Sequence, residues 1–95
     1  NMTLAFSNSF NFDWDISNWN TENVNNMYNM FDTSTSFNWD ISSWNVNSVT
    51  NMWYMFAWAS SFNQDISWWN VSWVTNYASF DSNTPSWNNL FKPNF

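Results

Sequence analysis

The sequence predicts an α/β repeat fold, a leucine-rich-repeat-like solenoid of about four 25-residue strand–turn–helix coils. Two observations support it. The 95 residues align in rows of 25 without a gap, and the second and third rows are identical at 15 of 25 positions. A period of 25 also lies within the 20–29 residues of leucine-rich repeats. We therefore expect a single solenoid segment over residues 1–95, with repeats at 1–25, 26–50 and 51–75 and a degenerate repeat at 76–95.

The periodicity inside a row predicts one strand and one helix. The stretch 62–67 is short, carries Ile66 and is bounded by Ser and Trp, which predicts a buried strand. Four apolar residues recur at i, i+3, i+6 and i+7, as on one face of a helix: Val49, Met52, Met55 and Phe56. Ser48 precedes this stripe and is the expected N-cap, as Ser72 is before Val74.

The repeated polar and aromatic columns are interpreted as structural. The tryptophans of one column are expected to stack in the core: Trp19, Trp44 and Trp69. Two columns of asparagine are expected to form amide ladders that bond their own turn and the next one. They are Asn1, Asn26, Asn51 and Asn76, and Asn20, Asn45 and Asn70.

Composition excludes several functions. One Lys against seven acidic residues gives a net charge of −6, which cannot neutralise a phosphate backbone, so no nucleic acid is expected. The absence of His and Cys removes zinc, thiol and imidazole chemistry, and no cofactor is expected. The longest apolar run, 52–59, is well below the ~18 residues of a spanning helix, so membrane insertion is not expected. The chain shows no signal peptide and begins at Asn1, as expected of a mature or excised piece of a longer protein.

Over residues 1–80 the sequence resembles the BspA-like surface-protein repeat, also known as a mycoplasma-type domain of unknown function. The matching stretches are MF at 55–56, ASSFNQDIS at 59–67, WNVS at 69–72 and VTN at 74–76. The resemblance implies a leucine-rich-repeat-like solenoid on cell-surface proteins, an extracellular location, and adhesion or surface display. It brings no catalytic residues.

The chain departs from that repeat pattern by having no glycine and by having tryptophans at positions where small residues are more usual. These are Trp14, Trp39, Trp53, Trp58, Trp68 and Trp73. Large aromatics outside the core columns predict an exposed aromatic face that binds sugar or packs against another chain. The expected interface residues are Trp53, Trp58, Trp73, Phe91 and Phe95.

One acidic column, Asp15, Asp40 and Asp65, is a candidate site, because stacked coils place like charges roughly 5 Å apart. Backbone N–H donors at a turn, raised pKa values or a bound Ca²⁺ would relieve the repulsion, and the turn is the favoured interpretation. Asp13 with Asp15 could imitate a glycosidase pair, but an Asp in every coil is the opposite of one tuned site, so no enzyme is expected. Asn1 and Asn70 begin the two N-x-S/T glycosylation sequons.

Two functions remain open. The first row begins in full register without a polar cap, and the C-terminal end is apolar, with Phe91, Pro93 and Phe95. Head-to-tail stacking would then produce an extracellular structural filament, because a heterologous contact that does not close grows helically. The alternative is a cell-surface adhesion or display module that binds a glycan or a host or cell-surface protein.

Overall fold

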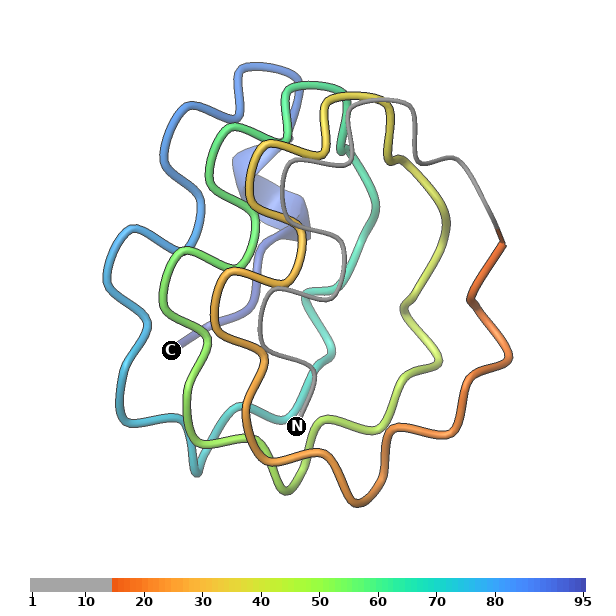
Figure 1. Ribbon diagram of the computed structural model, residues 1–95, viewed down its shortest axis with the longest axis vertical. Helices are drawn as coiled ribbons and strands as arrows, with labels where there is room; N and C mark the ends of the chain where they lie inside the picture. Colours follow the sequence, from red (N-terminus) through yellow and green to blue (C-terminus); the bar gives the residue numbers. More distant parts are fainter. Residues whose placement is uncertain (1–14) are drawn as a thin grey trace.

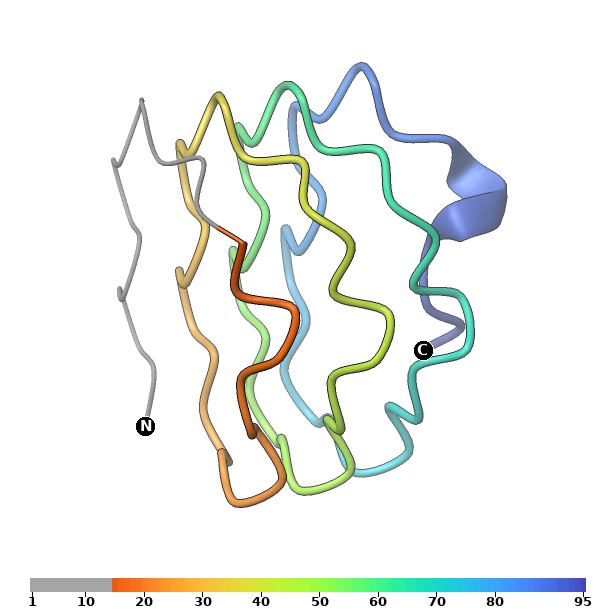
Figure 2. The ribbon, with the colours of Figure 1, turned by 90° about the vertical axis from the view of Figure 1, so that its right-hand side faces the viewer.

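The computed structural model describes residues 15–95, which wind as stacked coils of 25 residues (Figure 1). The segments 26–34, 51–59 and 76–84 lie side by side and form what we call the first wall (Figures 1 and 2). The segments 38–46 and 63–71 lie side by side on the other side of the coils and form the second wall. Side chains from both walls fill the space between them.

Regular secondary structure is nearly absent from the part of the chain that the structure describes. Within residues 15–95 the one helical element is a short 3-10 helix, η1 (Asn89–Phe91), and the β pairing is limited to isolated parallel bridges from Asn51 to Asn26 and Asn76. The prediction of an α/β, leucine-rich-repeat-like solenoid of strand–turn–helix coils is therefore wrong, because this part of the chain has no α-helix and no strand.

The hydrogen bonds of the first wall explain why neither element forms. From residue 27 to 33, every second N–H donates to a carbonyl 24 residues later, in the next coil, at 2.8–2.9 Å. The N–H groups of Met30, Asp32 and Ser34 instead donate to the carbonyl three residues before, at 3.0–3.3 Å. The segment 52–58 repeats the first of these bonds onto 76–82 at 2.8–3.1 Å. Half of these backbone N–H groups donate to the next coil and half donate within their own turn. The segment therefore forms neither an α-helix nor a continuous strand ladder.

The spacing of the apolar residues correctly predicted which side chains are buried, but it wrongly predicted that they lie on an α-helix. The four residues of the expected helical stripe are all fully buried: Val49, Met52, Met55 and Phe56. Ser48 does not cap a helix, and its hydroxyl donates to the carbonyl of Glu22 in the preceding coil at 3.0 Å. In the expected strand 62–67, the Ile66 N–H donates to the carbonyl of Phe91 at 2.9 Å, and no ladder forms.

Each coil of the first wall contains two left-handed residues, although the chain has no glycine. They recur in two columns, with φ between 55° and 63°: Asn29, Tyr54 and Ser79, and Thr33, Trp58 and Asn83. Each is the third residue of a tight turn, the position at which a type II turn requires positive φ. Asn tolerates this conformation, whereas it strains β-branched and bulky residues.

Aromatic rings stack through the core. Phe31 lies 4.2 Å from Phe37 and 5.3 Å from Phe56 between ring centroids, and Phe56 lies 4.5 Å from Phe62. All four rings are fully buried, as expected of the repeated columns. Trp44 and Trp69 are also buried, as predicted, but they do not stack on each other; their rings lie tilted against Phe31 and Phe56. Their indole N–H groups donate to the carbonyls of Ile16 and Ile41. Trp19 differs, since it is 43% exposed.

Candidate functional site

The acidic column forms hydrogen-bonded turns. In each case Oδ1 accepts the N–H of the serine two residues on, at 2.9–3.0 Å: Asp15 with Ser17, Asp40 with Ser42, and Asp65 with Ser67. Hydrogen bonds from the hydroxyl and the N–H of that serine lower the pKa of Asp15 and Asp65, so the alternative of raised pKa values is wrong for these two carboxylates. Within residues 15–95 no group of three acidic side chains is placed to hold a metal ion.

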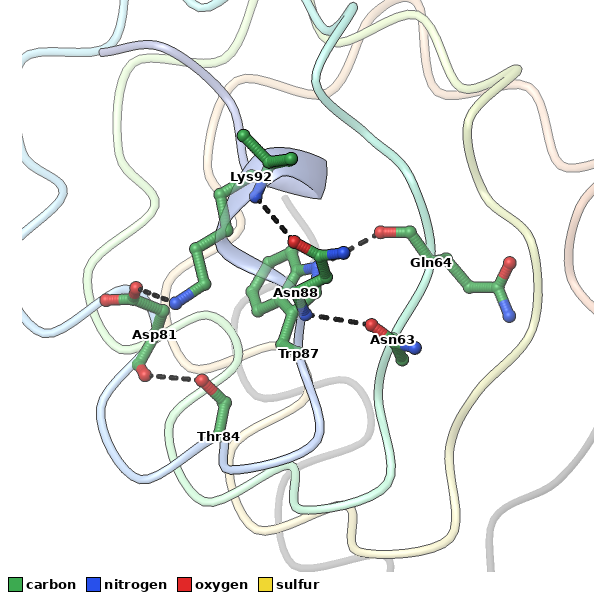
Figure 3. Close-up of polar contacts among 8 residues, drawn as sticks. Asn63, Gln64, Asp81, Thr84, Trp87, Asn88 and Lys92 are labelled. Carbon is green, nitrogen blue, oxygen red and sulfur yellow. Dashed lines mark hydrogen bonds and ion pairs between the residues drawn. The ribbon is translucent and has the colours of Figure 1, made fainter.

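The asparagine columns also bond their own turns. The side chains of Asn26, Asn51 and Asn76 accept the N–H two residues on at 3.0–3.4 Å, and those of Asn20, Asn45 and Asn70 do so at 2.9–3.1 Å. A column that the sequence analysis did not single out connects neighbouring coils. Asn38 accepts the N–H of Asn63 at 2.7 Å. Asn63 in turn accepts the N–H of Asn88 at 2.8 Å, as Figure 3 shows. Its signal was a recurring Asn at position 13 of each row from the second onward.

The expected interface residues differ in exposure. Trp58 and Trp73 are 55% and 70% exposed, whereas Trp53 is half-buried and stacks on Tyr28 with 5.0 Å between ring centroids. Phe91 packs against the core, and Phe95 is exposed.

The remaining candidate residues from the sequence analysis lie in several parts of the chain. Trp39 and Trp68 are exposed and belong to segments of the second wall, whereas the exposed Trp58 belongs to the first wall. Asn70, which begins a glycosylation sequon, is exposed. Asn1, Asp13 and Trp14 lie outside the described residues.

An open pocket of about 490 Å³ lies beside Trp58, and we call it the Trp58 pocket. Its lining comes from three segments: Trp58 and Ser60, then Asp81, Asn83, Thr84 and Pro85, and finally Lys92. The Trp58 N–H donates to the carbonyl of Ser82 at 2.8 Å, which holds the third and fourth coils together at this point. Lys92 follows η1, which returns the chain toward the fourth coil.

Charge in the Trp58 pocket is paired. Lys92 is the one basic side chain of the sequence, and its Nζ lies 2.7 Å from Oδ2 of Asp81 and 5.5 Å from the ring centroid of Trp87 (Figure 3). The Thr84 hydroxyl donates to the carbonyl of Asp81 at 2.7 Å and fixes that turn. The sequence analysis named Trp58 as an interface residue but missed the pocket, because its lining residues are brought together only by the coiling.

The family described as Mycoplasma protein of unknown function, DUF285, matches residues 1–93. The chain belongs to this family. The match confirms the mycoplasma-type repeat family at this coarse level, whereas the BspA-like and leucine-rich-repeat parts of the resemblance gain no support. No curated protein and no solved structure matches the chain. Among residues 15–95, no helix is long and apolar enough to cross a bilayer.

The last coil of this DUF285 chain carries a row of unpaired backbone donors. The N–H groups of Tyr77, Ser79, Asp81 and Asn83 occupy the positions that donate to the next coil in the two preceding segments of the first wall. No acceptor within residues 15–95 receives them. We call these four N–H groups the donor row.

Proposed function

We propose that the chain is a non-enzymatic, extracellular structural subunit of a cell-surface filament, assembled by head-to-tail stacking of coils from successive copies. The donor row supports this proposal. In the preceding coils the equivalent N–H groups donate to the next coil at 2.8–3.1 Å, so a segment that offers alternate carbonyls would extend the same pattern. An unpaired edge of this kind is a template for another chain. Because the contact joins two different surfaces, it propagates into a filament unless it closes.

Hydrogen bonds alone would not hold two copies together. At about 1 kcal/mol net each, the four donors contribute about 4 kcal/mol, at the lower limit of the roughly 4–15 kcal/mol that association costs. Apolar contact must supply the remainder, and Tyr77, Leu90 and Phe95 are 47%, 83% and 40% exposed in the last coil. The net charge of −6 repels copies from one another, and salt screens that repulsion.

The test is the mass of the full chain in solution. Sedimentation velocity and light scattering across micromolar concentrations should show particles whose mass increases with protein concentration and with salt. Electron microscopy of the same samples should show filaments. A monodisperse monomer at every concentration and salt level would contradict the proposal.

Proline variants test the donor row itself. Tyr77→Pro removes one donor of the row, and Tyr77→Ala removes the same ring while keeping the N–H. The matched control is Ala78→Pro, because the Ala78 N–H is bonded to Asn76 within its own turn and proline is favoured at that second turn position. Tyr77→Pro should assemble less than Tyr77→Ala, and Ala78→Pro should assemble like the parent chain. Equal assembly of the two Tyr77 variants would exclude the donor row as the contact.

A surface adhesion or display module that binds a protein or a glycan is the second candidate function. The exposed Trp58 and Trp73 and the pocket beside Trp58 favour it. Antibody labelling of an epitope-tagged chain on intact cells tests the surface location that both candidates require, and labelling only after the cells are permeabilised would contradict both.

A further inference from the structure

We propose that the Trp58 pocket binds a neutral saccharide. The inference gives the second candidate function a specific site and ligand class, and it does not depend on filament assembly. Three features carry it: an exposed indole at a strained backbone position, paired charges around the indole, and a cavity of suitable size.

Trp58 occupies a position where a tryptophan is costly. Its φ of 63° is left-handed, and the same column holds Asn83, a residue that adopts this conformation readily. The strain brings no aromatic packing, because Trp58 is 55% exposed and no ring within residues 15–95 stacks on it. Its indole N–H also donates to no acceptor within residues 15–95. The left-handed turn recurs in every coil of the first wall, so the distinguishing feature here is the exposed tryptophan that it carries.

The polar groups around Trp58 select a neutral, hydroxyl-rich ligand. Asp81 and Lys92 neutralise one another at 2.7 Å, so the pocket favours neither a cation nor an anion. Both side chains are partly exposed, which leaves carboxylate lone pairs and ammonium protons for a ligand. The Ser60 hydroxyl and the Asn83 amide add further donors and acceptors.

A sugar ring matches this arrangement. The C–H face of a pyranose is apolar and stacks on an indole, while its hydroxyls both donate and accept. The volume of about 490 Å³ lies in the lower half of the roughly 300–1,000 Å³ range of small-molecule sites, as suits a monosaccharide or a short oligosaccharide. Pro85 supplies a second apolar surface at the pocket wall.

The experiment measures binding of a defined panel to the full chain at dilute protein and low salt, where self-association is weakest. The panel contains glucose, galactose, N-acetylglucosamine, N-acetylgalactosamine and their common disaccharides, with sialic acid and indole as the anionic and aromatic arms. Saturation-transfer NMR detects contact, and isothermal titration gives the affinity. At least one neutral sugar should bind through the C–H protons of one ring face.

Two tryptophan variants locate the site. Trp58→Asn removes the indole, and asparagine fits this turn because Asn83 occupies the equivalent position. The variant should weaken sugar binding at least tenfold. Trp73→Asn removes a more exposed indole that does not line the pocket, and it should bind like the parent chain. Asp81→Asn, which breaks the charge pair, should also weaken binding. Thermal unfolding shows whether each variant is folded.

The outcomes are separable. Binding of no neutral sugar, binding of only the indole or sialic acid probe, or equal binding by Trp58→Asn would each overturn the proposal. Sedimentation of the same variants keeps the result distinct from assembly, because loss of sugar binding with unchanged particle mass concerns the pocket alone.

Discussion

Replacing Thr33 with asparagine should stabilise the chain. Thr33 has a φ of 62°, and a β-branched residue in the left-handed region costs roughly 1–2 kcal/mol. Asn83 occupies the equivalent turn of the fourth coil at a φ of 58°, so asparagine fits this backbone. The substitution loses the hydrogen bond from the Thr33 hydroxyl to Asp32, which is worth about 0.5–1 kcal/mol. The net expectation is a gain of about 0.7 kcal/mol, within a range of about 0–1.5 kcal/mol, or an unfolding midpoint higher by about 3–6 °C.

The control variants separate strain from hydrogen bonding. Thr50→Asn also loses a hydroxyl hydrogen bond, to the carbonyl of Asn25, but relieves no strain because Thr50 is not left-handed. It should therefore be neutral or slightly destabilising. The reverse change, Asn83→Thr, should cost about 1–2 kcal/mol. Urea and thermal unfolding followed by circular dichroism measure all three variants. If Thr33→Asn is no more stable than Thr50→Asn, the turns store no strain and the reasoning fails.

Three further predictions concern the hydrogen bonds between and within coils. Trp69→Phe loses the indole donor to the preceding coil and should cost about 1–3 kcal/mol in urea unfolding, whereas Trp68→Phe, at a 92% exposed residue, should stay within about 0.5 kcal/mol. Asn63→Ala removes an acceptor between coils and should cost about 1 kcal/mol in the same assay. The pKa of Asp65 is lowered in the folded chain, so folding favours the ionised carboxylate. This carboxylate therefore stabilises the fold at pH values above its ordinary pKa of 3.8, and the stabilisation is lost as the pH falls through the lowered pKa of the folded chain. The stability advantage of the parent chain over Asp65→Asn should therefore disappear in acid, and an advantage that is unchanged at low pH would exclude the Ser67 hydrogen bonds as its source.

The sequence predicted burial better than it predicted local structure. Row alignment identified apolar columns such as Met52 and Phe56, and these side chains are fully buried. The alignment could not distinguish a helix from a series of turns. Turns whose N–H groups donate alternately to the next coil and to their own coil also place apolar residues three and four apart. A glycine at the left-handed positions would have revealed the turns, but Thr33, Tyr54 and Trp58 occupy them instead.

The Trp58 pocket was beyond sequence reasoning for a different reason. Its charge pair joins Asp81 of the first wall to Lys92 after η1, and the register between those segments follows from the irregular C-terminal row. No period relates the two residues. The Asn38 and Asn63 ladder, in contrast, was available from the row alignment, since those residues share a position.

The direction of the hydrogen bonds connects the two proposals. In the first wall, alternate N–H groups from residue 27 to 33 and from 52 to 58 donate to later carbonyls, so the last coil presents donors, although the Asn76 N–H donates back to Thr50. Asp81 and Asn83 contribute their N–H groups to the donor row and their side chains to the Trp58 pocket. A copy that stacks through the donor row alone would use backbone donors and leave those side chains available to a ligand. A filament would then carry one saccharide pocket per copy, spaced by four coils or about 19 Å. Such an array would bind a repetitive glycan surface by avidity even where each single pocket binds weakly.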